Sequence, residues 1–392
     1  MNRRLFLRTS FAAAAAALCG HGCRSARLPA AATPSAPASR KLIVVLFGGG
    51  TRSSESMDDP EHRFIPHLWQ EMVPRGTLFT NMRVEHKVVH PNSAGSIVTG
   101  HWEWDDIDWS KPVRHPTLFE ICRRARDAPD TAAWAFVYAS ILAKASYSTA
   151  EGYGARFAAN LVEPPTLPRT AAEAMDTLMR RAAAGGRPEA ELQAAGECAR
   201  LARATSRIAR GGWRSQPAAR FMEDEYARWK QDAGTTSHDA FLTDRALACM
   251  RWFSPDVMLI AYGEIDCAHY GSLSRYTEAI QRTDELTSRI WQAARQLPGY
   301  RDNTLMLILP DHGRELDRPG GSGFIHHSDF YTNTGADEGC RRVWMLALGP
   351  GAAAGRKIDL PVSITAVAAT GLEFLGLNAS EGAAASVLEM CR

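Results

Sequence analysis

The chain alternates between short, continuous apolar runs and longer stretches in which apolar positions recur every three or four residues. Five runs have the length of buried strands, at residues 42–47, 133–138, 257–262, 305–309 and 343–348. Helical spacing predicts helices over residues 116–126 and 276–296. Because a strand that is buried on both faces is continuously apolar, these runs predict an α/β fold whose mostly parallel central sheet is sandwiched by helices.

Composition and charge narrow the class of protein. Of the 392 residues, 45% are hydrophobic and 22% are charged, which is typical of a globular chain and excludes a disordered one. Lys and Arg total 45 and Asp and Glu total 43; without the three arginines of the amino-terminal segment, 42 basic residues remain. A balance this close to neutral gives no electrostatic footprint for nucleic acid or for an anionic membrane.

The amino-terminal segment, MNRRLFLRTSFAAAAAALCG, resembles a twin-arginine export signal. Arg3 and Arg4 precede an Ala-rich stretch that is too short to span a bilayer, and no later segment is long and apolar enough to do so. We therefore expect residues 1–23 to direct the protein to the periplasm or the medium. The alternatives are a chance basic start before an Ala-rich helix, and a lipid anchor on Cys23, whose surrounding lipobox is poor.

The rest of the chain divides into a linker and one large domain. Residues 24–40 are rich in Ala, Pro and Ser, which is typical of a linker. Residues 41–392 contain all the predicted strands. Between about residues 150 and 250 the composition shifts to Ala, Arg and Glu with helical spacing, which we interpret as a helical insertion within the domain.

Polar side chains gather after three of the predicted strands. The run at 42–47 is followed by GGGTRSSES, the run at 257–262 by GEIDCAHYG, and the run at 305–309 by PDHGRELD. Ligands in open α/β sheets bind beyond the carboxyl ends of the strands, so we expect these segments to meet at one edge. They would bring together Glu264, Asp266, His269, Asp311 and His312.

Carboxylates combined with neutral imidazoles indicate a divalent metal site. Zinc prefers such ligands, and manganese and iron also accept them. A further pair, His326 and His327, lies in the Gly-rich segment PGGSGFIHHSDF, which can fold back over the sheet edge. Each motif alone has a plainer interpretation, because an Asp-x-x-His is often a surface pair or helix cap and adjacent histidines are often solvated. Their joint occurrence after predicted strands favours a site for one or two metal ions.

In their residues and in their order along the chain, these segments resemble motifs of the alkaline phosphatase superfamily, which includes sulfatases and type I phosphodiesterases. PDHG is similar to the family's Asp-His metal pair, GEIDCAHYG to its Asp…His motif, and PNSAGSIVTG and HPTLFEICRRA to segments near its nucleophile. The resemblance covers most of residues 41–349 and implies an alkaline-phosphatase-like catalytic domain. It also implies two metal ions that act on a phosphate or sulfate ester. The implied ligands are Asp311 and His312 for the nucleophile-side ion, and Asp266, His269 and one of His326 and His327 for the other.

The sequence departs from the family pattern at two positions. At the end of the first strand the family has an aspartate, whereas this chain has Gly49. Glu55, Asp58 or a nearby histidine would then have to supply the missing ligand. The phosphodiesterases of the family carry a threonine nucleophile shortly before Pro-Asn, where this chain has Val89.

Several residues near these positions are candidates for catalysis and substrate binding. Ser93 is the nearest hydroxyl to the missing nucleophile, at a predicted helix start whose free N–H groups suit an anionic ester; the alternative is a helix cap. Asn92 would hold a phosphoryl oxygen. Arg52 would clamp an anionic oxygen or form a surface salt bridge. His86 and His90 remain open as ligands, bases or solvated side chains. The absence of Cys-x-Pro-x-Arg disfavours a formylglycine sulfatase.

The sequence therefore predicts an exported, metal-dependent hydrolase of phosphate or sulfate esters. The two family departures favour an alternative, a degenerate member that binds metal or ligand without catalysis. A third interpretation is a transferase or mutase on the same fold.

Overall fold

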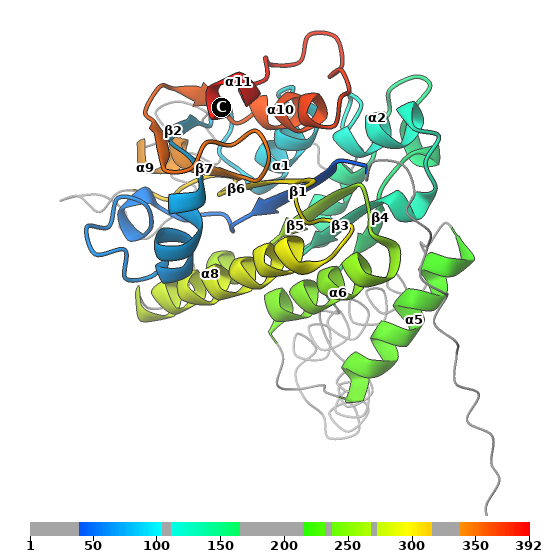
Figure 1. Ribbon diagram of the computed structural model, residues 1–392, viewed down its shortest axis with the longest axis horizontal. Helices are drawn as coiled ribbons and strands as arrows, with labels where there is room; N and C mark the ends of the chain where they lie inside the picture. The colour runs from blue at the N-terminus through cyan, green and yellow to red at the C-terminus, as the bar shows by residue number, and fades with distance from the viewer. Residues whose placement is uncertain (1–38, 104–110, 165–214, 232–236, 268–272, 316–337) are drawn as a thin grey trace, which may run out of the picture. The chain divides into compact units, whose positions relative to one another are not determined.

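The computed structural model describes residues 39–103, 111–164, 215–231, 237–267, 273–315 and 338–392 (Figure 1). Residues Ala38–Arg392 form one compact unit. The expected export signal and almost all of the linker lie outside the described residues, as does much of the expected helical insertion. Three expected metal ligands, His269, His326 and His327, also lie outside them.

A mixed sheet of nine described strands forms the centre of this unit. The strands are β1 (Lys41–Leu46), β2 (Gly76–Arg83), β3 (Ala133–Val137), β4 (Asn160–Val162), β5 (Val257–Ala261), β6 (Thr304–Leu309), β7 (Arg342–Leu348), β8 (Arg356–Ile358) and β9 (Val362–Ser363). Their order is β4-β3-β5-β1-β6-β7-β2-β8, and β9 pairs with β2 beside this path. Only β7 runs antiparallel to its described neighbours, β6 and β2. The predicted, mostly parallel sheet is confirmed, and each of the five predicted strands matches within one residue at either end.

Strand β2 is a strand that the apolar pattern did not predict. Its sequence, GTLFTNMR, is interrupted by polar residues although most of it is buried. The hydroxyl of Thr77 donates to the carbonyl oxygen of Cys391 at 2.7 Å, and that of Thr80 donates to the carboxylate of Asp359. Two buried threonines of β2 are thus satisfied by the carboxyl-terminal segment, a contact that no local sequence pattern predicts.

Helices cover both faces of the sheet (Figure 1). One face carries α1 (His90–Thr99), α2 (Leu118–Ala125), α10 (Ala366–Phe374) and α11 (Leu388–Cys391). The other carries α5 (Gln216–Gln231), α6 (His238–Phe253) and α8 (Leu273–Gln296). The shorter described helices are η1 (Ser53–Glu55), η2 (Leu68–Met72), η3 (Val73–Arg75), η4 (Asp130–Ala132), η5 (Ser140–Ser146), η6 (Gly154–Arg156), α7 (Glu264–Cys267) and α9 (Glu338–Arg341).

Strand β1 divides the core into two layers. Leu42, Val44 and Leu46 pack with apolar residues of α1, α2 and α10. Ile43 and Val45 point to the opposite face and pack with residues of α5, α6 and α8. Because successive side chains of a strand alternate between faces, a continuous apolar run is what a strand between two helical layers requires.

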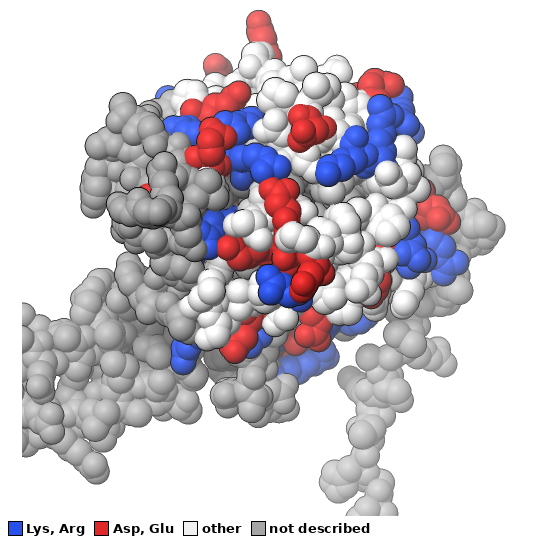
Figure 2. Space-filling view, turned by 90° about the vertical axis from the view of Figure 1, so that its left-hand side faces the viewer, with Lys and Arg blue, Asp and Glu red and all other residues white. Residues whose placement is uncertain are grey.

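The surface agrees with the balanced composition. On the face shown in Figure 2, Lys and Arg side chains lie among Asp and Glu side chains over the described part. Within the described ranges, no helix combines the length and the apolar character that crossing a bilayer demands.

Candidate metal centre

Four side chains with metal-binding atoms converge beyond the carboxyl ends of β5 and β6. Asp311 and His312 follow β6, Asp266 lies on α7 after β5, and His90 is the first residue of α1. Strands β5 and β6 both pair in parallel with β1, so their carboxyl ends lie at the same edge of the sheet. The structure therefore brings three of the expected ligands together and adds His90 to them.

His90 lies at the centre of this cluster. Its Nδ1 atom is 2.9 Å from Oδ2 of Asp311 and 3.1 Å from Nε2 of His312. Its Nε2 atom is 3.1 Å from Oδ1 of Asp266. Only 10% of the His90 side chain is exposed, so the ring is buried between two carboxylates and a second imidazole.

Burial and mutual charge set the protonation of the cluster. Burial disfavours the charged form of His90, but Asp266 and Asp311 outweigh it and raise the pKa of His90 to about 10. Burial likewise opposes ionisation of Asp311, but His312 and His90 lower the pKa of that carboxyl. Burial lowers the pKa of His312 to about 4, which Asp311 only partly offsets. His312 is therefore neutral, the form in which an imidazole binds a metal, whereas His90 is protonated near neutral pH and would release a proton on binding a metal.

The donor set and one unsatisfied oxygen fit a divalent metal ion. His90, Asp311 and His312 each offer one ligand atom, and these atoms lie within 4.8 Å of one another. Within the described part of the chain, Oδ1 of Asp311 is buried without a hydrogen-bond partner. Such an atom costs roughly 1–3 kcal/mol unless another group satisfies it. Two imidazoles and a carboxylate form a ligand set that zinc accepts, as do manganese and iron.

Tyr138 joins the cluster from the end of β3. Its hydroxyl donates to Oδ2 of Asp266 at 3.4 Å, and its ring lies edge-on to that of His90, with centroids 5.9 Å apart. A Cβ atom on Gly263 would lie 2.1 Å from Cγ of Tyr138, so this approach requires glycine there. The sequence pattern identifies Tyr138 only as the end of a strand. The one available signal was a tyrosine at the carboxyl end of a strand next to β5.

The backbone ahead of Asp266 is held from α6. Oδ1 of Asp239 accepts a hydrogen bond from the N–H of Gly263, and Oδ2 accepts one from the N–H of Glu264, each at 2.9 Å. Burial raises the pKa of Asp239 to about 7. Glu264, which the sequence placed at the same edge as the metal ligands, instead pairs with Arg282 at 2.6 Å. It contributes to the frame of the site and not to the four-residue cluster.

Asn92 and Ser93 lie in the first turn of α1, which begins at His90 after the extended backbone of Val89. Ser93 is fully buried, and its Oγ has no hydrogen-bond partner within the described segments. Nδ2 of Asn92 donates to the carbonyl oxygen of Lys87 at 2.9 Å. Both side chains belong to the helix that carries His90; their catalytic roles stay predictions.

Arg52 forms a buried, bidentate ion pair. Its Nε and Nη2 atoms each donate to the carboxylate of Glu55 at 2.6 Å, and Nη1 donates to the carbonyl oxygen of Glu315. This pairing also engages Glu55, one of the residues considered as a substitute ligand near Gly49. Another, Asp58, pairs with Arg342 at 2.6 Å. Of the substitutes considered, only a nearby histidine, His90, lies in the cluster.

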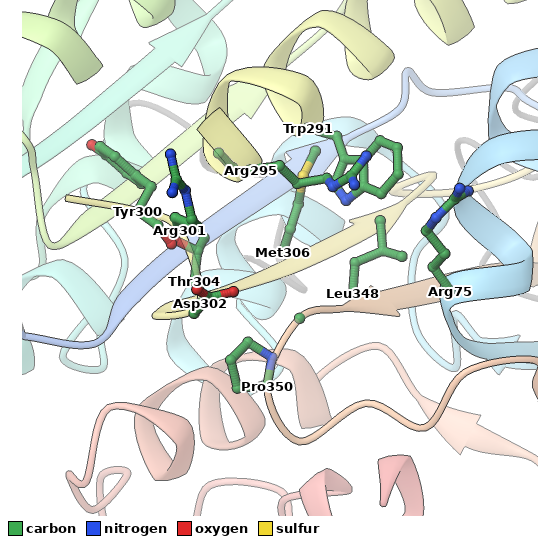
Figure 3. Close-up of a pocket in the computed structure, with 12 residues that line it drawn as sticks. Arg75, Trp291, Arg295, Tyr300, Arg301, Asp302, Thr304, Met306, Leu348 and Pro350 are labelled. Atoms are coloured by element: carbon green, nitrogen blue, oxygen red, sulfur yellow. The ribbon is translucent and has the colours of Figure 1, made fainter. Parts of the chain in front are cut away.

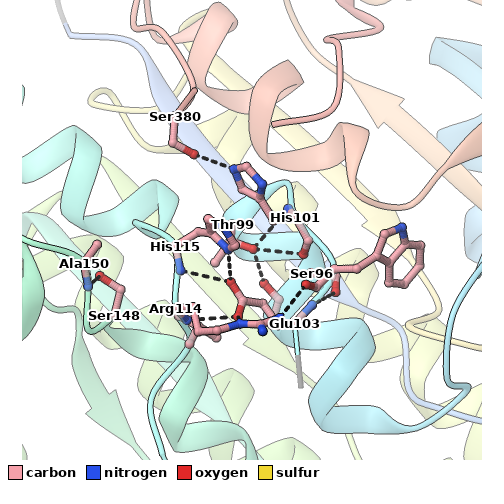
Figure 4. Close-up of polar contacts among 12 residues, drawn as sticks. Ser96, Thr99, His101, Glu103, Arg114, His115, Ser148, Ala150 and Ser380 are labelled. Atoms are coloured by element: carbon pink, nitrogen blue, oxygen red, sulfur yellow. Dashed lines mark hydrogen bonds and ion pairs between the residues drawn. The ribbon is translucent and has the colours of Figure 1, made fainter. Parts of the chain in front are cut away.

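A buried glutamate anchors the far end of α1 (Figure 4). Glu103 is fully buried and accepts hydrogen bonds from the N–H groups of Arg114 and His115, at 2.9 and 3.0 Å. Its own N–H donates to Oγ of Ser96 on α1 at 3.1 Å. These contacts fix the helix whose first residue is His90.

A cavity of about 450 Å³ lies at the other end of the strands (Figure 3). Its lining includes Thr304, the first residue of β6, and Leu348, the last of the antiparallel β7. Arg75, Trp291 and Arg295 also line it, and both guanidinium groups lie over the Trp291 ring. It holds none of the four clustered residues, so we take the cluster as the candidate site.

Neither a protein-family model nor a curated protein matches this sequence. Solved structures do match. Ps i-CgsB, crystallised with k-i-k-neocarrahexaose, aligns with a TM-score of 0.54 at 13% identity over 90% of this chain and 75% of that chain. A 2-O GAG sulfatase aligns at 0.54 and 10% identity over 90% and 74%. Phosphonate monoester hydrolase from Silicibacter pomeroyi aligns at 0.52 and 14% identity over 91% and 77%. The chain therefore shares its fold with a sulfatase and a phosphonate monoester hydrolase, and the expected α/β fold with a mostly parallel sheet between helices is confirmed.

Proposed function

We propose that this chain is a metal-dependent hydrolase of phosphate or sulfate esters. The observation that carries the proposal is the cluster of His90, Asp266, Asp311 and His312 at the carboxyl edge of the sheet. Burying acids and imidazoles together in one small space lowers the stability of a fold, and such groups are concentrated at functional sites. The sulfatase and the phosphonate monoester hydrolase with the same fold support this chemical class.

Asp311, His312 and His90 would hold one ion. Asp266, which also contacts His90, would hold a second ion together with His269 and one of His326 and His327. A bound divalent ion supplies Lewis-acid polarisation of an ester oxygen. The chain's own groups then position the substrate. The amino terminus of α1 lies at the cluster, because His90 is its first residue, and the partial positive charge of a helix amino terminus favours an anionic ester oxygen. Ser93, on the same turn, would act as the nucleophile, with direct attack by water as the alternative.

The test is metal analysis combined with an ester panel. Purified protein should contain zinc, manganese or iron at close to one or two ions per chain. It should hydrolyse at least one of a nitrophenyl phosphate, a bis-nitrophenyl phosphate, a nitrophenyl phosphonate and a nitrocatechol sulfate, and it should lose that activity reversibly on chelation. Folded protein that takes up no metal and turns over none of these esters would contradict the proposal.

A specific observation also favours a non-catalytic alternative. The usual nucleophile position is Val89, and Ser93 is fully buried. Protein that binds metal but turns over no member of the ester panel would support a binding role. A phosphorylated Ser93, trapped by acid quench and found by mass spectrometry, would exclude it.

The proposal also includes export by the twin-arginine route. Replacing Arg3 and Arg4 together by lysine keeps the positive charge but removes the paired arginines. The doubly substituted precursor should stay in the cytoplasm, whereas the natural sequence should reach the periplasm or the medium. Equal export of both would exclude this route.

A further inference from the structure

Gly49 and His90 compete for one space at the end of β1. A Cβ atom on Gly49 would lie 2.0 Å from Cε1 and 2.3 Å from Nδ1 of His90, and 2.9 Å from Oδ1 of Asp311. The flanking Gly48 and Gly50 have positive φ angles of 101° and 77°, but Gly49 does not. The backbone conformation at Gly49 therefore does not itself require glycine. Glycine is required there because the His90 ring occupies the space of any Cβ atom.

We infer that His90, on α1, supplies the metal ligand that the end of β1 lacks. Glycine at position 49 leaves the space that the His90 ring occupies. The inference rests on the proposed metal-dependent function. Any side chain at position 49 would point into the cluster, whereas glycine leaves that space to the imidazole. The two positions thus form one unit: a ligand at either position excludes a ligand at the other.

The three ligand atoms lie near the separations that a zinc ion would require. Zinc binds nitrogen and oxygen ligands at about 2.0–2.1 Å, which separates neighbouring tetrahedral ligand atoms by about 3.3–3.4 Å. Nδ1 of His90 lies 2.9 Å from Asp311 Oδ2 and 3.1 Å from His312 Nε2, and the latter two atoms are 3.9 Å apart. These separations bracket the tetrahedral value, so shifts of a few tenths of an ångström admit the ion.

The other ring nitrogen gives Asp266 a separate role. Nε2 of His90 lies 3.1 Å from Oδ1 of Asp266, on the side of the ring away from Asp311 and His312. A metal-binding histidine usually donates its second N–H to a carboxylate, which fixes the tautomer and the ring orientation. Asp266 is therefore a positioning residue for His90, and Nδ1 is the atom that faces the ion.

This arrangement also determines which metals the site accepts. With His90 in place of a carboxylate at position 49, the ion meets two neutral imidazoles and one carboxylate, a set richer in nitrogen and less negative by one charge. Zinc and its neighbours accept such ligands, whereas calcium and magnesium prefer oxygen. Calcium and magnesium should therefore fail to displace zinc from this site.

The experiment exchanges the two positions. Zinc affinity is measured by competition with a chromogenic chelator on chelator-treated full-length protein, and Co²⁺ absorption reports the ligand set. His90→Ala should lower zinc affinity by more than the roughly 10–100-fold that losing an outer partner costs. Gly49→Asp alone should also bind poorly, because its side chain collides with the ring. The double variant Gly49→Asp/His90→Ala should regain most of the affinity, with a cobalt spectrum shifted by the exchange of nitrogen for oxygen.

Two further variants separate ligand from support. Asp266→Asn should weaken zinc binding by roughly 10–100-fold while leaving the visible cobalt bands in place. His67→Ala is the matched control, because His67 pairs with Glu71 outside the cluster and should leave both readouts unchanged. Circular dichroism with chelator present checks folding, and His90→Asn replaces His90→Ala if the latter does not fold.

The outcomes distinguish this inference from the proposed function. If His90→Ala keeps the zinc affinity and cobalt spectrum of the natural protein while Asp311→Asn loses them, His90 is no ligand and the metal-dependent function stands. If the double variant binds no better than His90→Ala, the exchange of positions 49 and 90 is wrong. If the natural protein binds no metal at all, the proposed function itself fails.

Discussion

Two largely buried clusters of charged side chains lie at opposite ends of the same parallel strands, and their charges are balanced in different ways. Ahead of β5, Asp256 pairs with Lys41 at 2.8 Å and with Arg126 at 2.9 Å. Beyond the other end of the strands, Asp266 and Asp311 face each other across the ring of His90. In the first cluster, two cationic side chains pair with the single carboxylate of Asp256. The second is built from groups whose charge depends on protons or on a metal.

The difference separates a cluster that serves the fold from one that serves chemistry. Asp256 also accepts a hydrogen bond from the hydroxyl of Ser39, so both its oxygens are engaged. Within the described chain, Oδ1 of Asp311 is buried without any such partner. A buried oxygen without a partner costs free energy, and a metal ion bound by the neighbouring ligands would satisfy it. Four variants or conditions sharpen this contrast.

The largest effect on activity is expected for Asp311, at the carboxyl ends of the parallel strands. Asp311→Asn removes a ligand charge, and loss of a Lewis acid worth several kcal/mol should lower kcat/KM by at least about 10³-fold. Zinc content should fall in parallel with the activity. Steady-state kinetics and metal analysis measure the two quantities. Unchanged zinc content would separate Asp311 from the metal.

The opposite pattern is expected for Asp256→Asn. Breaking a largely buried ion pair leaves Lys41 and Arg126 without their shared partner, so unfolding should become easier by about 3 kcal/mol. Activity per folded molecule and zinc content should match those of the natural protein. The measurements are urea denaturation and kinetics at a temperature where the variant remains folded. A loss of metal without a loss of stability would reverse the roles assigned to the two clusters.

The Asp256 cluster should also make stability depend on pH. Burial raises the pKa of Asp256, but Lys41 and Arg126 outweigh it and hold this pKa below the ordinary 3.8. Stabilisation by the charged form is therefore complete above pH 3.8 and disappears as the pH falls through the lower folded-state value. The stability gap between natural protein and Asp256→Asn should be constant down to about pH 4 and should close below it. If the difference in stability instead disappeared between pH 8 and 6, a group other than Asp256 would be responsible for it.

The smallest effect is expected from Tyr138→Phe. The hydroxyl donates a long hydrogen bond of 3.4 Å to Asp266, and Asp266 in turn contacts His90, the proposed ligand. Its loss should cost about 0.5–1.5 kcal/mol, or roughly 2–10-fold in kcat/KM, with zinc content unchanged. Loss of the metal in this variant would mean that Tyr138 supports the cluster far more strongly than its distance suggests.

The sequence predicts the strands of the central sheet better than it predicts the residues of the candidate site. Five strands are continuous apolar runs because the sheet is buried on both faces, and the Asp-His pair is visible because Asp311 and His312 are adjacent and follow a strand. Strand β2 was missed because its buried threonines are satisfied by distant carbonyl and carboxylate groups.

The residues that the sequence left open depend on contacts between remote segments. His90 was one of two histidines with several alternative roles, and its contacts with Asp311 and His312 in the space beside Gly49 distinguish it. Tyr138 belongs to the site because glycine at 263 lets its ring approach Asp266. Neither relation has a local sequence signal, because each links a side chain to a glycine on a different strand end.

One measurement tests the central claim most directly: anomalous scattering at the zinc absorption edge from crystals of the natural protein grown with zinc. We expect a peak within about 2.0–2.2 Å of His312 Nε2, of an oxygen of Asp311 and of His90 Nδ1. Crystals that show no peak at this position, with His90 still hydrogen-bonded directly to Asp311, would contradict the claim.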